Sequence, residues 1–189
     1  MSKPVLQVVI ASTRPGRIGL PIGQWFEQAA IHHGGFDVEL IDLAEVALPF
    51  FDEPNHPRLR QYTQDHTKAW SATIDRADAF VFVFPEYNHS MPGGLKNALD
   101  FLFHEWADKA AGLVSYAGVS AGTRAAAALK PVLGALRMVP VVEAATIPFF
   151  TQFIDEDGVF TGNAELEAGA TAMLDEIARL TRGLQTVRR

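Results

Sequence analysis

Residues 85–100 read PEYNHSMPGGLKNALD and decide the fold of this chain. They follow the apolar run 79–84, AFVFVF, which predicts a buried strand, and they lead into a helical pattern that opens at Gly94. A strand, a polar turn-forming loop and a helix in this order are typical of parallel α/β sheets, whose ligands bind beyond the carboxyl ends of the strands. We therefore expect backbone amides of this loop to meet a flat ligand.

Strand-like and helix-like segments alternate on both sides of this stretch. The predicted strands are 5–11, 36–43, 79–84, 113–117 and 139–145, and the predicted helices are 20–31, 59–76, 94–103, 125–136 and 164–182. Strict alternation indicates parallel strands joined by helical crossovers. Five strands and five helices favour a flavodoxin-like, doubly wound α/β sheet of order 2-1-3-4-5, with helices on both faces, as one domain over residues 1–189. Pro131 lies inside a predicted helix, where it removes one hydrogen bond and should kink the helix.

Composition narrows the possible functions. The net charge of −6 argues against general nucleic-acid binding, which needs a positive field. No apolar run approaches the roughly 20 residues that span a bilayer, and the N-terminus lacks a signal-peptide pattern. The absence of cysteine excludes disulfides, thiolate metal sites and cysteine nucleophiles. We expect a cytoplasmic protein that binds no metal.

A second loop, residues 12–19, reads STRPGRIG between the first strand and the first helix. Hydroxyl groups, backbone amides and two guanidinium groups at a helix N-terminus are suited to phosphate, although a solvated basic turn is the simpler alternative. The loop lacks the Gly-Lys-Ser/Thr ending of a P-loop and the GxGxxG pattern of dinucleotide sites. We therefore expect the phosphate of a mononucleotide.

A third loop, Gly118 to Arg124, follows the fourth strand and matches the G-x-S-x-G pattern of a nucleophile elbow at Ser120. Serine hydrolases of that fold place their histidine after the serine in the chain. The last histidine here is His104, so the hydrolase interpretation fails. Small residues at this position instead suit close approach of the backbone to a planar ring.

Taken together, these motifs resemble the NADPH-dependent FMN reductase family, which includes NAD(P)H quinone reductases. The resemblance covers nearly the whole chain, and the pattern at residues 85–100 carries it most specifically. It implies that three sets of residues bind FMN: the phosphate loop, the ring platform and the loop on the other side of the ring. These residues are Ser12, Thr13, Arg14, Arg17, Ile18 and Gly19; Pro85, Glu86, Tyr87 and Asn88; and Ser120, Ala121 and Gly122.

The chain departs from the family pattern at three positions. Ala11 stands where a glycine is usual, and Arg17 and Gly19 stand where hydroxyl or amide side chains are common. These departures affect the details of phosphate binding more than the identity of the cofactor. The resemblance also implies a homodimer or homotetramer formed through the helices 94–103 and 125–136.

The implied activity is transfer of two electrons from NADPH or NADH through bound FMN to a quinone or a similar small acceptor. The flavin performs this chemistry, so we nominate no catalytic side chain. Two alternatives use the same fold and cofactor: a flavodoxin-like electron carrier that is not an enzyme, and a reductase that releases reduced FMN as its product.

Overall fold

The computed structural model describes residues 3–188, which contain one five-stranded sheet. Its strands are β1 (Val5–Ile10), β2 (Asp37–Asp42), β3 (Ala79–Pro85), β4 (Ala110–Ala117) and β5 (Val139–Pro148). Neighbouring strands are all parallel, in the order β2-β1-β3-β4-β5. The flavodoxin-like topology expected from the sequence is confirmed.

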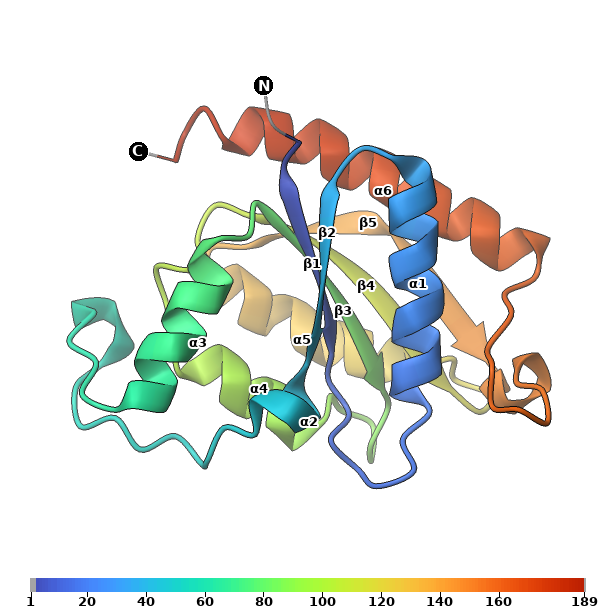
Figure 1. The fold of residues 1–189 in the computed structure, drawn as a ribbon, viewed down its shortest axis with the longest axis horizontal. Coiled ribbons are helices and arrows are strands. Elements are labelled where there is room, and N and C mark those ends of the chain that lie inside the picture. Colours follow the sequence, from blue (N-terminus) through green and yellow to red (C-terminus); the bar gives the residue numbers. More distant parts are fainter. Residues whose placement is uncertain (1–2, 189) are drawn as a thin grey trace.

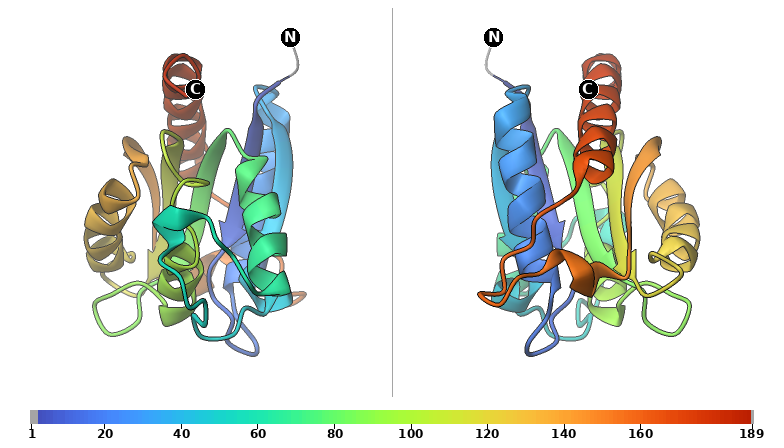
Figure 2. Two further views of the ribbon diagram at one scale, coloured as in Figure 1. Left: turned by 90° about the vertical axis from the view of Figure 1, so that its left-hand side faces the viewer. Right: turned by 90° about the vertical axis from the view of Figure 1, so that its right-hand side faces the viewer.

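Helices cover both faces of this sheet (Figures 1 and 2). They are α1 (Gly19–His33), α2 (Leu43–Val46), α3 (Asp65–Asp75), α4 (Gly93–Asp100), α5 (Thr123–Ala135) and α6 (Ala164–Leu184). Side chains of α1 and α6 pack on one face, and those of α3, α4 and α5 pack on the other. The helix α5 includes Pro131 and continues beyond it to Ala135.

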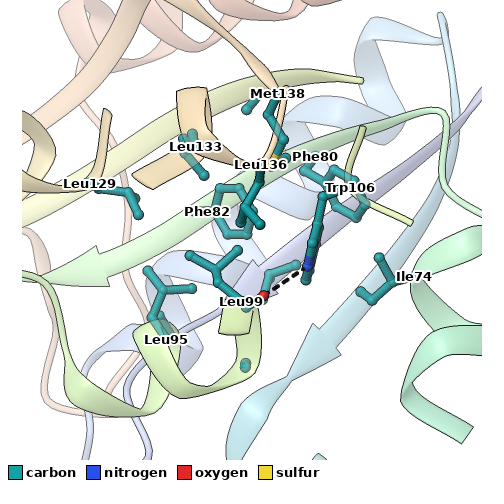
Figure 3. Close-up of a cluster of buried hydrophobic side chains, with 14 of the residues drawn as sticks. Ile74, Phe80, Phe82, Leu95, Leu99, Trp106, Leu129, Leu133, Leu136 and Met138 are labelled. Atoms are coloured by element: carbon teal, nitrogen blue, oxygen red, sulfur yellow. Dashed lines mark hydrogen bonds between the residues drawn. The ribbon is translucent and has the colours of Figure 1, made fainter. Parts of the chain in front are cut away.

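The central strand β3 shows why two helical layers form. All of its residues are buried, as expected for a strand covered on both faces. Successive side chains alternate between faces, so Phe80 and Phe82 contact the α3, α4 and α5 layer while Val81 and Val83 contact the α1 and α6 layer. Trp106 packs on Phe80 and donates a hydrogen bond from Nε1 to the carbonyl oxygen of Leu99 at 3.1 Å (Figure 3).

Several segments differ from the sequence-based prediction: β4 begins at Ala110 where 113 was predicted, α4 ends at Asp100 where 103 was predicted, and the short helix α2 was not predicted. Two further differences concern α3 and β5. The helix expected over 59–76 begins only at Asp65, because the buried carboxylate of Glu53 accepts hydrogen bonds from the backbone N–H groups of Thr63 at 2.8 Å and Gln64 at 2.9 Å. These bonds hold the preceding residues in a non-helical conformation. The strand β5 extends to Pro148, three residues beyond the prediction, and a short 3-10 turn, Phe150–Phe153, follows it closely.

The loops after β1 and β3 project from the same end of the sheet, at the bottom of Figure 1 and of both views in Figure 2. Parallel strands impose this arrangement, because all their carboxyl ends point the same way. The three polar loops singled out in the sequence therefore meet at one end. Among the described residues, none of the helices has the length and apolar character needed to cross a membrane.

Candidate functional site

A hollow of about 290 Å³ lies at the carboxyl end of the sheet. The loops after β1, β3 and β4, together with the turn after β5, form its walls. Its lining residues are Ser12, Arg14, Arg17, Ile18, Pro85, Glu86, Tyr87, Tyr116, Ala117, Gly118 and Phe150. Seven of these belong to the residues predicted from the sequence to hold FMN.

The side of the hollow nearest α1 is basic. The guanidinium group of Arg14 is exposed and forms no hydrogen bond or ion pair within residues 3–188. Arg17 forms an ion pair through Nη2 with the nearly buried carboxylate of Asp42. The Arg17 Nε is buried and has no hydrogen-bond partner among the described residues. An anion in the hollow would therefore meet the guanidinium group of Arg14, which is unpaired in the described chain, with Arg17 beside it.

Asp42 is held by more than its ion pair with Arg17. It caps the N-terminus of α2, because its Oδ1 accepts a hydrogen bond from the backbone N–H of Ala44 at 2.9 Å. The carboxylate is thus fixed at the end of β2, where it pairs with Nη2 of Arg17. Arg17 lines the hollow with one end of its guanidinium group already paired.

Two hydroxyl groups lie beside these arginines. Ser12 is buried, and its Oγ lies 2.8 Å from the Oη of Tyr87. The side chain of Tyr87 therefore reaches the loop 12–19, and the contact with the ring that the resemblance implies stays a prediction. In this conformation Tyr87 links the predicted phosphate loop to the predicted ring loop.

Backbone hydrogen bonds close the turn that follows Tyr87. The N–H of Tyr87 donates to the carbonyl of Ser90 at 2.9 Å, and the N–H of Ser90 donates back to Tyr87 at 3.0 Å. Asn88 and His89 between them have positive φ angles of 49° and 66°. The side chains of Asn88 and Ser90 form no hydrogen bond within residues 3–188, so the backbone alone closes the turn. Asn88 lies at the exposed tip, outside the hollow.

Glu86 joins the loops after β3 and β4. Its carboxylate, only 5% exposed, accepts hydrogen bonds from Arg124 through Nε at 2.6 Å and through the backbone N–H at 3.2 Å. Burial alone would raise the pKa of Glu86, but hydrogen bonds from Ser120 and Arg124 outweigh it and lower the pKa. The ionised carboxylate of Glu86 is therefore already paired with Arg124. The part of Glu86 that is left to face the hollow is its backbone.

The predicted residues of the third loop lie beside the hollow instead of lining it. Ala121 and Gly122 have positive φ angles of 50° and 78°, and the turn is anchored by the Ser115 hydroxyl, which donates to the Ala121 carbonyl at 2.8 Å. A Cβ at Gly122 would lie 2.9 Å from the backbone nitrogen of Tyr116, so this position requires glycine. Ser120 and Ala121 instead line a neighbouring hollow of about 710 Å³ between β5 and α6.

Two further predicted residues occupy other surroundings. Thr13 lines a separate hollow of about 520 Å³ formed largely by the segment after β2 and by α4. Gly19 is buried at the start of α1, under the loop 12–19. Both belong to the loop 12–19 on the basic side of the hollow, but neither lines the hollow itself.

Four lining residues were absent from the predicted set: Tyr116, Ala117, Gly118 and Phe150. The first three end β4 and open the next loop, so the general rule that ligands meet strand ends would have found them. Phe150 packs edge-on against Tyr116, with ring centroids 5.4 Å apart. Its position depends on the extra length of β5, which the sequence pattern did not indicate.

Known proteins that resemble this chain agree with this geometry. The family model for NADPH-dependent FMN reductase matches residues 5–152. An NAD(P)H-dependent FMN reductase of Schizosaccharomyces pombe is 42% identical over 149 residues, which cover 77% of this chain and 74% of that protein. An NAD(P)H:quinone oxidoreductase of Solanum tuberosum is 37% identical over 93 residues, covering 48% of this chain and 46% of that protein.

A solved structure shows the same fold. FerB, a flavoenzyme NAD(P)H:(acceptor) oxidoreductase from Paracoccus denitrificans, superposes with a TM-score of 0.75 at 21% identity, over 95% of this chain and 98% of that one. The match of the family model over most of the chain, with the S. pombe relative, establishes the relationship. This chain belongs to the NADPH-dependent FMN reductase family of flavin-dependent NAD(P)H oxidoreductases.

Proposed function

We propose that the hollow at the carboxyl end of the sheet holds FMN, with its phosphate at the loop 12–19 and its ring against residues 85–88 and 117–122. The observation that carries this assignment is the exposed guanidinium group of Arg14, which lines the hollow and has no partner within residues 3–188. A phosphate oxygen would accept charge-assisted hydrogen bonds from it.

The charges around the hollow fit a phosphate monoester. The two carboxylates nearest to it are already neutralised, since Asp42 pairs with Arg17 and Glu86 pairs with Arg124. Arg14 therefore faces the hollow with no competing acid. The start of α1 adds the positive end of a helix dipole at the same place.

Bound FMN would accept hydride from a nicotinamide and pass two electrons to an acceptor. The chain's own residues have simpler tasks. Arg14 and Arg17 neutralise the phosphate, and the bond between Glu86 and Arg124 keeps the two ring loops at a set distance. The strand ends at Pro85 and Ala117 are held in register by the parallel pairing of β3 and β4. No side chain is required to move a proton in this scheme.

We propose a quinone or a similarly small, flat molecule as the electron acceptor. The support is chemical: the hollow is bounded by strand ends and apolar groups such as Pro85, Ala117 and Phe150, which suit a ring in stacking contact. NADPH and the acceptor would use one opening in turn, which predicts ping-pong kinetics.

The visible absorption spectrum of the purified protein, recorded before and after anaerobic addition of NADPH, tests this proposal. We expect a bound flavin spectrum that bleaches with NADPH or NADH and returns on addition of 1,4-benzoquinone. A protein that binds no FMN in a titration would overturn the assignment. If NADPH reduced the bound flavin but no quinone reoxidised it, only the proposed acceptor would be wrong.

The same experiment separates the two alternatives. An electron carrier of the flavodoxin type would bind FMN tightly but would not be bleached by NADPH within the mixing time. A reductase that releases reduced FMN would lose its flavin on a desalting column after reduction. Stoichiometric FMN that stays with the protein through turnover supports the retained-cofactor scheme.

We further propose that the protein is cytoplasmic and forms a homodimer, or a tetramer of two dimers, through α4 and α5. The supporting feature is an exposed aromatic segment near α4: Phe50 is 92% exposed, and the N–H of Phe51 donates to the Asn97 side chain on α4 at 2.9 Å. Light scattering coupled to size-exclusion chromatography should give twice or four times the mass of 20.6 kDa. A monomer at micromolar concentration would contradict this proposal.

A further inference from the structure

Tyr116 is a buried polar residue at the end of β4 whose role no sequence motif predicts. It is the penultimate residue of the strand and is only 3% exposed. Its ring belongs to the apolar layer beneath α1 and α6 and packs edge-on against Phe150. Packing thus accounts for an aromatic ring at this position, but it does not account for the hydroxyl group on that ring.

The Tyr116 hydroxyl reaches the floor of the loop 12–19. A Cβ added at Gly19 would lie 2.8 Å from Tyr116 Oη, a separation that real Cβ atoms essentially never show. The phenol oxygen therefore occupies the space that any side chain at position 19 would fill. It comes from a different strand, more than ninety residues away in the sequence, yet it lies where the first turn of α1 begins.

This oxygen lies on the basic side of the hollow, near Arg14 and Arg17. Tyr116 lines the same hollow as Ser12 and feels the positive charges of Arg14 and Arg17. Burial, with a smaller contribution from Tyr87, nevertheless raises its pKa well above the usual range. The phenol therefore stays protonated at every physiological pH and has a proton to donate.

We infer that Tyr116 is a further phosphate-binding residue: it reaches from β4 through the space left by Gly19 and donates its O–H to a phosphate monoester held by the loop 12–19. The inference rests on the proposed FMN site and deepens it. Gly19 and Tyr116 then form a coupled pair, in which the missing side chain on α1 makes room for a hydroxyl group supplied by the sheet.

The variant Tyr116→Phe tests this inference, because it keeps the ring and its packing on Phe150 and removes only the hydroxyl. Apo-protein is titrated with FMN and, separately, with riboflavin, which has no phosphate, and flavin fluorescence gives the two dissociation constants. Loss of one hydrogen bond to a charged group predicts about 10-fold weaker FMN binding or more. Riboflavin binding should stay unchanged.

Tyr62→Phe is the matched control. It also removes one tyrosine hydroxyl, which here donates to the Glu105 carboxylate far from the hollow, at 3.0 Å. We expect it to leave both dissociation constants unchanged. Equal weakening of FMN and riboflavin by Tyr116→Phe, or no change in either, would overturn the role in phosphate binding.

The coupling to position 19 gives a second, independent test. Gly19→Ser alone pushes its side chain into the phenol and should weaken FMN binding, whereas Gly19→Ser combined with Tyr116→Phe should recover part of the affinity lost by either. Simple additivity of the two changes would contradict the coupling. If the wild-type protein bound no FMN, the proposed function itself would fail. If the wild type bound FMN and the Tyr116→Phe variant bound it equally well, only the inference about Tyr116 would fail.

Discussion

The two ends of the sheet differ in how their charged side chains are paired. At the amino end, Asp78 accepts hydrogen bonds from the Val5 N–H at 2.9 Å and from Arg188 at 3.1 Å. Lys109, directly before β4, donates to the carbonyl oxygens of Ile74 at 2.9 Å and Asp75 at 3.2 Å, where α3 ends. These groups tie the strand starts to the helix ends.

Buried donors without a partner in the described part of the chain occur at both ends, at Arg17 Nε and at Arg188 Nε, and positive φ angles also occur at both. The carboxyl end differs because the exposed guanidinium group of Arg14 has no partner within residues 3–188 and lines a hollow. A charged group that lines a hollow without a partner is typical of a site that is completed by a ligand. We therefore expect the amino end to stabilise the fold and the carboxyl end to bind the ligand.

This comparison makes the two ends separable by mutation. Changes near the amino end should reduce stability and leave flavin affinity per folded molecule unaltered. Changes at the carboxyl end should reduce flavin affinity and leave stability unaltered. The following predictions test that separation, beginning with the largest expected effect.

Trp106→Ala removes a buried aromatic side chain that packs on Phe80 and Phe82 near the start of β3 (Figure 3). The loss of packing and the resulting cavity should lower the free energy of unfolding by about 3–5 kcal/mol, measured by urea denaturation. Val142→Ala, at a side chain that is 86% exposed, is the control and should change it by less than about 0.5 kcal/mol. A small effect of Trp106→Ala would show that the core repacks around the gap.

Arg14→Ala should weaken FMN binding by about 10- to 100-fold, because it removes a charge-assisted hydrogen bond to the phosphate. The stability of the apo-protein should not change, since Arg14 has no partner within residues 3–188. Fluorescence titration and urea denaturation of the same preparation measure both quantities. The control is Arg182→Ala, which removes an exposed arginine on α6. Unchanged flavin affinity in Arg14→Ala would refute the phosphate assignment.

Lys109→Met keeps the apolar stem and removes the ammonium group, so the carbonyl oxygens of Ile74 and Asp75 lose their donor. We expect a loss of about 1–3 kcal/mol in the free energy of unfolding, with FMN affinity unaltered. Lys68→Met, at an exposed lysine on α3, should have little effect. Equal stability of Lys109→Met and wild type would mean that burying the ammonium group cancels its hydrogen bonds.

The same lysine predicts a small pH dependence. Burial, together with the nearby Arg188, lowers the pKa of Lys109 to about 8, below its value of about 10.4 in an unfolded chain. Between these values the unfolded chain binds more protons, so stability should rise as pH increases from 8 to about 9.5, by roughly 1.5 kcal/mol. Urea denaturation across this range should show the rise in wild type and a flatter profile in Lys109→Met. Parallel profiles would exclude Lys109 as the cause.

Much of this arrangement was accessible from the order of residues. The apolar run before Pro85 predicted the central strand, and its alternation with helical patterns predicted a parallel sheet. Parallel strands necessarily place their following loops at one end. The phosphate loop, the ring loop and the loop at Gly118 were therefore expected to converge, and the structure places them together.

The helix start at Asp65 was not accessible in this way. Residues 59–64 have a composition compatible with helix, and only the Glu53 carboxylate, brought in by the preceding loop, bonds the backbone in another conformation. Tertiary contacts of this kind override local preference. Leaving a buried carboxylate without hydrogen bonds costs more free energy than losing one turn of helix.

The sequence by itself determined the strand order, the family and the end of the sheet at which we propose the FMN site, because periodicity and turn residues act locally. The tertiary structure alone decided which atoms face the hollow. It turned Arg17 partly toward Asp42, bent Tyr87 over Ser12 and brought the Tyr116 hydroxyl to the space above Gly19. These contacts join residues far apart in the chain, and their geometry depends on strand register and packing, which no local pattern encodes.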